Sequence, residues 1–155
     1  MMAAKMVMAP LPNIEPVSLI IMLMGPLFGL RALMAVYVYV FLEATVFGFG
    51  LWWISYLYVW PLCLVLSILF RNIKDVLGWA VLAGGFGLMF GALCALVYLP
   101  IGGIPLFFST VVAGIPFDLL HCAGNFAMML LLRTPCMRAL TLAAGTDTSP
   151  DSLNR

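Results

Sequence analysis

The stretch GIPFDLLHCAGNFAMMLLL, residues 114 to 132, decides the fold class of this chain. A helix needs roughly 20 mostly apolar residues to cross a hydrocarbon core of about 30 Å, and this run is close to that length. Three polar residues, Asp118, His121 and Asn125, interrupt an otherwise apolar sequence. The stretch therefore indicates a membrane helix, and its polar side chains require an explanation of their own.

Composition supports the same conclusion for the whole chain. Of its 155 residues, 65% are hydrophobic and only 8% are charged, which is more apolar surface than one small water-soluble core can bury. We therefore predict an all-α integral membrane protein in contact with a lipid bilayer. The formal net charge is +1, and the seven Lys and Arg are scattered along the chain, so no basic surface for nucleic acid is expected.

No pattern of reactive side chains indicates a metal site, a cofactor or catalysis. The four cysteines lie far apart without CxxC or Cys/His ligand spacing and are interpreted as packing thiols. They are Cys63, Cys94, Cys122 and Cys136. A single histidine leaves no second imidazole for a metal, and no GxSxG, HExxH or GxxxxGKS motif is present. The sequence thus predicts no enzyme, no metal and no cofactor.

Proline, glycine and charged residues divide the apolar sequence into five predicted spans and a stub that precedes Pro10. The spans cover about residues 17–30, 32–47, 54–70, 76–98 and 106–132. One long helix over residues 17–47 is the alternative, but it would bury Arg31 near its middle at a cost of about 2.5 to 3.5 kcal/mol. A short helical hairpin that turns near Arg31 is favoured, because Pro26 and Gly29 precede it.

Connections with cations alternate with connections without them along this predicted topology. Arginine and lysine concentrate in short cytoplasmic loops. All five that flank the spans fall on one side, namely Arg31, Arg71, Lys74, Arg133 and Arg138. The connections at 10–16, 48–53 and 99–105 contain none. We therefore predict a multi-pass protein of the cell membrane whose C-terminus is cytoplasmic, with residues 1–140 forming a transmembrane helical bundle and residues 141–155 a disordered cytoplasmic tail.

The three polar residues of the last span share one helix face. At 100° per residue, Asp118, His121 and Asn125 point in directions of about 0°, 300° and 340°. Ionisable groups at membrane depth usually face a bundle interior or a wet cavity, so this face is a candidate functional site. The alternative is that the three groups bind neighbouring helices and hold the bundle together. Pro116, two residues earlier, predicts a kink or a restart of the helix.

An aromatic stretch, GFGLWWISYLYVW (residues 48–60), follows the predicted span over residues 32–47. Interfacial belts of Trp and Tyr explain such a stretch, but a site that stacks on a flat ligand would use the same residues. The five polar aromatic residues are Trp52, Trp53, Tyr56, Tyr58 and Trp60. Two acidic residues, Glu15 and Glu43, are predicted to lie in the same outward half of the membrane.

Three stretches together resemble the substrate-binding S component of energy-coupling factor (ECF) transporters. They are PNIEPVSLIIML (12–23), FGFGLWWISYLYVWPL (47–62) and GIPFDLLHCAGNFAMMLLL (114–132). The resemblance covers about residues 3 to 140. It implies a six-helix bundle of the prokaryotic type, with an outward-open site for a vitamin or related micronutrient. The partners it implies are a transmembrane coupling subunit and two ATPase subunits.

The resemblance also suggests which residues form the site. Polar contacts would come from Glu43, Asp118, His121 and Asn125, stacking from Trp53 and Tyr56, and a lid from Asn13 and Glu15. In that family the first helix is full length and often carries alanines four residues apart. Ala3, Ala4 and Ala9 do not have that spacing, so we expect a truncated first helix here: five full spans plus a stub.

Two other classes of function compete with this interpretation. The first is a small membrane scaffold without a ligand, in which the polar face of the last span only joins helices. The second is an intramembrane enzyme that uses Asp118 and His121 as acid and base, for which the chain offers no convincing nucleophile. A ligand retained by the purified protein would separate the transporter subunit from both.

Overall fold

All regular structure in the described part of the chain is helical. The computed structural model describes residues 1, 2, 6 and 16–145, and within them no strand is found. The elements are α2 (Val17–Phe28), η1 (Gly29–Ala32), α3 (Leu33–Phe47), α4 (Leu51–Leu69), α5 (Val76–Ala95), η2 (Leu96–Tyr98) and α6 (Leu99–Ala143), where η marks a short 3₁₀ helix. The predicted all-α class is confirmed for these residues.

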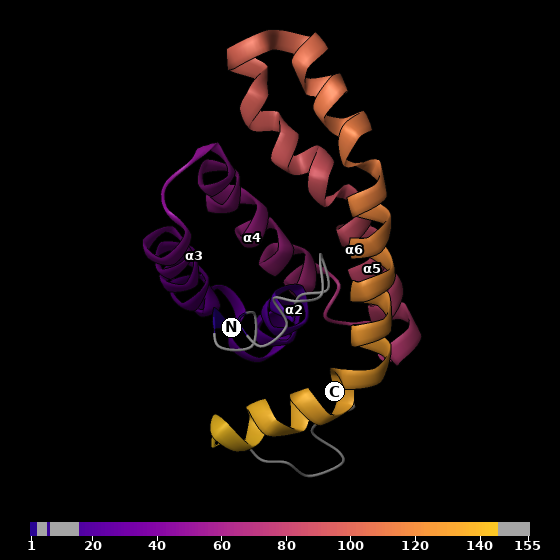
Figure 1. Ribbon diagram of the computed structural model, residues 1–155. Coiled ribbons are helices and arrows are strands. Elements are labelled where there is room, and N and C mark those ends of the chain that lie inside the picture. Colours follow the sequence, from indigo (N-terminus) through magenta and orange to yellow (C-terminus); the bar gives the residue numbers. More distant parts are fainter. Residues whose placement is uncertain (3–5, 7–15, 146–155) are drawn as a thin grey trace.

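Three helical stretches are long and apolar enough to cross a membrane. They are Val17–Phe47, Leu51–Leu69 and Val76–Ala143. The third folds back on itself as the α5–α6 hairpin (Figure 1). The predicted six-helix count is not supported, because α2 and α3 have 12 and 15 residues. At 1.5 Å per residue each spans only about 18 to 22 Å, less than a hydrocarbon core of about 30 Å.

The predicted break near Arg31 is confirmed. Helix α2 ends at Gly29, whose φ of 56° lies in the left-handed region that glycine adopts without strain. The 3₁₀ turn η1 follows, and Arg31 within it is exposed. Helix α2 packs mainly on α4 and also on α6, whereas α3 packs on α4. The break therefore lets two short helices cover different parts of the bundle.

The cationic connections lie at one end of the molecule. Residues 29–32, residues 70–75 and the bend in the C-terminal part of α6 lie toward the lower end of Figure 1. The connections at 48–50 and 96–103 lie at the opposite ends of the helices that they join. This arrangement agrees with the grouping of cations expected from the sequence, while the side of the membrane stays a prediction.

Helix α6 differs from its predicted form at both ends and at Pro116. Within it only Gly102 and Gly103 have non-helical dihedral angles, so the regular helix follows Gly103 and runs through Pro116 without a restart. Of the kink or restart predicted at Pro116, the restart is wrong, because neighbouring turns keep helical dihedrals although Pro116 lacks a donor; the kink stays a prediction. The helix ends at Ala143, past the predicted boundary at residue 140, and Thr141 is buried. Residues 146–155 lie outside the described residues.

The core lies where α2, α3, α4, α5 and α6 meet. Its largest fully buried side chains include Trp60, Trp79, Tyr39, Ile21, Met22, Leu23, Leu64 and Met129. The outward faces are also apolar, as Met34, Phe41 and Leu131 show with exposed fractions of 78%, 53% and 71%. Exposed apolar surface of this extent is stable in hydrocarbon and unfavourable in water, which supports the membrane assignment.

Candidate functional site

The polar face of α6 is buried against its neighbour in the hairpin. Asp118, His121 and Asn125 are 7%, 6% and 3% exposed, so the prediction that they share one buried face is confirmed. Helix α5 covers this face along most of its length. The three residues therefore meet another helix and not an open, water-filled cavity.

Glycines make this close approach of α5 and α6 possible. Gly84, Gly87 and Gly91 are three and four residues apart and lie on the face of α5 that meets α6. A Cβ on Gly87 would lie 2.7 Å from the backbone oxygen of His121, and one on Gly84 would lie 3.3 Å from Phe126 Cβ. Small residues at such spacing let membrane helices pack backbone to backbone.

Asp118 joins the two helices directly. Its Oδ1 accepts a hydrogen bond from the backbone N–H of Gly91 at 2.8 Å. A hydrogen bond to a carboxylate in an apolar interior is among the stronger interactions available there. Asp118 thus has a defined partner within the hairpin. Its hydrogen bond joins two helices, as the alternative interpretation of the sequence expects.

His121 and Asn125 differ from Asp118 because each has a buried polar atom without a partner in the described structure. These atoms are His121 Nε2 and Asn125 Nδ2. The indole Nε1 of Trp60, a residue that is 1% exposed, likewise has no hydrogen-bond partner there. A buried polar group that forms no hydrogen bond is unfavourable by a few kcal/mol, and lipid offers no water to satisfy it.

An aromatic cluster connects Trp60 to His121. We use this name for Tyr56, Trp60, Phe86 and Phe90, whose rings come from α4 and α5. The Trp60 and Phe90 ring centroids are 5.3 Å apart, those of Tyr56 and Phe90 are 6.1 Å apart, and Phe86 adjoins both Trp60 and Phe90. The Phe90 ring lies 4.6 Å from the His121 ring in an edge-to-face arrangement. The unpartnered atoms of Trp60 and His121 therefore belong to residues whose rings both adjoin Phe90.

Sequence reasoning chose Tyr56 as a site residue, named Trp60 only as a member of the aromatic stretch, and missed Phe86 and Phe90. Trp60 follows Tyr56 by four residues in the same aromatic stretch, so helical spacing could have placed both on one face. Phe86 and Phe90 also have this four-residue spacing, but they stand in an apolar span where phenylalanine is unremarkable. Nothing in the sequence distinguishes them from ordinary core residues.

Two other predicted site residues, Glu43 and Trp53, form hydrogen bonds with residues of α3. Glu43 is fully buried on α3 and accepts a hydrogen bond from Tyr39 Oη at 2.5 Å; the Tyr39 ring lies 6.2 Å from that of Trp60. Trp53 turns toward α3, where its Nε1 donates to the Val40 carbonyl at 3.1 Å. Two predicted lid residues, Asn13 and Glu15, lie outside the described residues.

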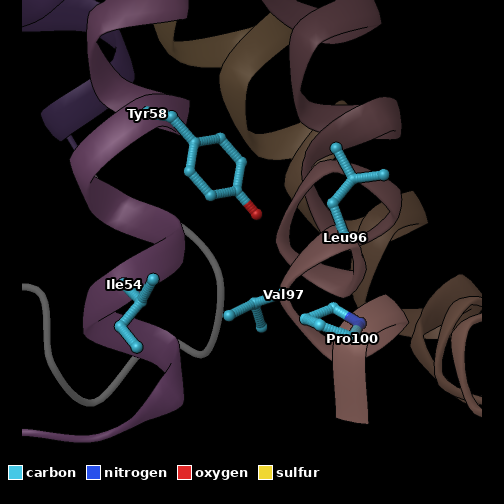
Figure 2. Close-up of a pocket in the computed structure, with 5 residues that line it drawn as sticks. All are labelled: Ile54, Tyr58, Leu96, Val97 and Pro100. Atoms are coloured by element: carbon cyan, nitrogen blue, oxygen red, sulfur yellow. The ribbon is translucent and has the colours of Figure 1, made fainter. Parts of the chain in front are cut away.

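A second feature, an apolar groove, lies between α4 and the end of α5. Its volume is about 430 Å³, and it is lined by Ile54 and Tyr58 of α4, Leu96 and Val97 of η2, and Pro100 of α6 (Figure 2). The hydroxyl of Tyr58 points across the gap and donates to the Leu93 carbonyl at 2.9 Å. Nothing in the sequence indicated this groove, because it depends on where α5 ends.

Comparisons with protein-family models, curated proteins and solved structures find no match to this chain. Among the residues that the structure describes, no group of three His, Cys, Asp or Glu side chains is placed to hold a metal ion. The functional argument therefore rests on the buried polar atoms of the bundle and on the groove.

Proposed function

We propose that this chain is a membrane-embedded subunit that binds a small molecule, of the kind represented by the S components of ECF importers. It would capture a vitamin or related small heterocycle from the outer face and pass it to a coupling subunit with two ATPase subunits. One observation carries the proposal: buried nitrogens of Trp60 and His121 lack partners within an aromatic cluster, and Asn125, one helical turn after His121, has another.

These nitrogens are suited to a ligand that brings its own hydrogen-bonding groups. An indole N–H and an amide NH₂ are donors, and an imidazole nitrogen either donates or accepts. A planar heterocycle would satisfy them while its ring packs against the aromatic cluster. Since the nitrogens are closed off from solvent here, the ligand would enter only when the aromatic cluster separates from His121.

The remaining predicted residues take supporting roles in this proposal. Glu43 and Asp118 would contribute acidic groups beside the site, Trp53 would hold α4 against α3, and Asn13 and Glu15 would form the lid. The cationic end of the bundle would face the cytoplasm, as short loops rich in Lys and Arg do. No catalytic step is part of the proposal.

A membrane scaffold without a ligand is the second candidate. The Asp118–Gly91 hydrogen bond and the glycine face of α5 favour it, because both serve helix association alone. The two candidates differ over His121 and Asn125. A scaffold has no use for buried nitrogens without partners, whereas a binding subunit needs them.

The test compares apolar variants of these two residues with a matched control. We would purify the full chain, identify retained small molecules by mass spectrometry, and measure their binding to His121→Phe, Asn125→Leu and the control Met128→Leu. Met128 is buried on the same helix but carries no polar atom. Under the proposal the first two variants lose binding by roughly tenfold or more, as loss of a hydrogen bond worth over 1.4 kcal/mol implies, and Met128→Leu does not.

The scaffold predicts a different outcome. No small molecule is retained, and His121→Phe and Asn125→Leu stabilise the protein or leave it unchanged, because each removes an unpartnered polar atom. Full binding by both variants would also rule out the proposed site, even if a ligand is found.

A further inference from the structure

The apolar groove of Figure 2 offers a site that is independent of the proposed function. It lies on the surface of the bundle, since Ile54 and Leu96 are 44% and 41% exposed and Pro100 is also exposed. It is flanked by α4 and by the Val76–Ala143 stretch, both of which are apolar enough to cross a membrane. The groove therefore faces what surrounds the bundle, near one end of these apolar helices.

The chemistry of its lining restricts the occupant. Four of the five side chains are hydrocarbon only, and the fifth, Tyr58, has its hydroxyl committed to the Leu93 carbonyl at 2.9 Å. The lining thus presents no free side-chain donor or acceptor. Water and polar solutes gain nothing there, and apolar cavities stay dry unless an apolar molecule fills them.

The backbone holds the groove open. Helix α5 ends at Ala95 and tightens into the 3₁₀ turn η2, and the non-helical Gly102 and Gly103 then reverse the chain. The Tyr58–Leu93 hydrogen bond ties α4 to α5 at one side of the space. Because the gap is set by these backbone features, a change of one side-chain rotamer does not close it.

We propose that this groove binds one acyl chain of a membrane phospholipid. The occupant must be apolar, must reach the bundle from its surroundings, and must fit a narrow space between two helices. A lipid tail meets all three conditions, and packing contacts, which drive association within a bilayer, favour filling such a void. The lipid would brace α4 against the α5–α6 turn.

A photoreactive lipid tests the proposal directly. The full chain is reconstituted in phosphatidylcholine vesicles with a phosphatidylcholine that carries a diazirine on one acyl chain, irradiated, and mapped by peptide mass spectrometry. We expect adducts to concentrate at residues 54–58 and 96–100, above the level on the exposed face of α3, which includes Met34 and Phe41. Adducts distributed in proportion to exposure would overturn the proposal.

Groove-filling variants provide the second arm. Val97→Trp and Ile54→Trp each fill the groove from a different wall, and Val112→Trp, at a site on α6 that is 62% exposed and outside the lining, is the control. We expect both groove variants to lose the excess labelling and Val112→Trp to keep it. Unchanged labelling in the two folded groove variants would exclude the site. If the groove variants do not fold, the labelling map of the wild-type protein decides alone.

Discussion

At the scale of single residues, the carboxylate of Glu43 shows how this chain accommodates an acid in an apolar bundle. The side chain is fully buried, and Tyr39, one helical turn earlier, donates a hydrogen bond to its Oε1 at 2.5 Å. Residues four apart on a helix lie on one face, so the sequence itself brings donor and acceptor together. Burial of the acid thus depends on a local partner.

This pair gives a prediction with a built-in control. Tyr39→Phe removes the hydroxyl and keeps the ring, so we expect a loss of stability of roughly 1 to 3 kcal/mol. Tyr37→Phe makes the same chemical change at an exposed site, where the hydroxyl forms only a long 3.4 Å contact to the Leu57 carbonyl. It should have little effect. Thermal unfolding in detergent measures both, and equal losses would contradict the role given to Tyr39.

At the scale of elements, α5 and α6 form the most extensive helix–helix contact, and this hairpin contains the polar face of the candidate site. At Gly87 the two backbones approach closely, because a Cβ there would lie under 3.0 Å from backbone atoms of His121 and Cys122. Backbone cannot move aside as a side-chain end can. A substitution at this position must therefore push the two helices apart.

We expect Gly87→Ala to destabilise the chain by roughly 1 to 3 kcal/mol, as overpacking of a tight interface does. Gly85→Ala is the control, because it lies on the same helix with nothing within 4 Å of a new Cβ. The control should be neutral or slightly stabilising, given the better helix propensity of alanine. Thermal melts of both variants decide the matter, and a neutral Gly87→Ala would show that the helices do not pack this closely.

The same hairpin shows what the sequence could and could not predict. Helical spacing alone placed Asp118, His121 and Asn125 on one face, and that face is buried as expected. Which helix covers it was not predicted, because partner choice in a membrane depends on close backbone approach. The spacing of Gly84, Gly87 and Gly91 indicates a helix face that another helix can approach closely. It does not indicate which helix packs there.

Helix lengths were predicted less well than helix positions. The break at Gly29 was foreseen from Pro26 and Arg31, because each disfavours a continuous buried helix. The course of α6 past Pro116 was not, since neighbouring turns keep helical dihedrals when one donor is missing. Composition and periodicity therefore fix the kind of element here, and tertiary packing fixes its extent.

At the scale of the whole molecule, the distribution of charge gives the bundle two different ends. The turn that contains Arg31 and the connection that contains Arg71 and Lys74 lie at one end of the bundle (Figure 1). The connection at residues 48–50, which has no cation, lies at the opposite end of α3 and α4. A membrane potential and anionic cytoplasmic headgroups both favour the cationic end inside.

This asymmetry predicts which residues a membrane-impermeant thiol reagent reaches. In a background whose native cysteines are replaced by alanine or serine, Phe49→Cys should be labelled in intact cells and Asn72→Cys only after the membrane is opened. Both residues are exposed and stand in connections between helices, so access depends on the side of the membrane alone. Labelling of both residues from outside would contradict the placement of these two connections on opposite sides of the membrane. If instead only Asn72→Cys is labelled in intact cells, the two connections still lie on opposite sides but the orientation in the membrane is reversed. The proposed entry for a ligand would then lie on the cytoplasmic side.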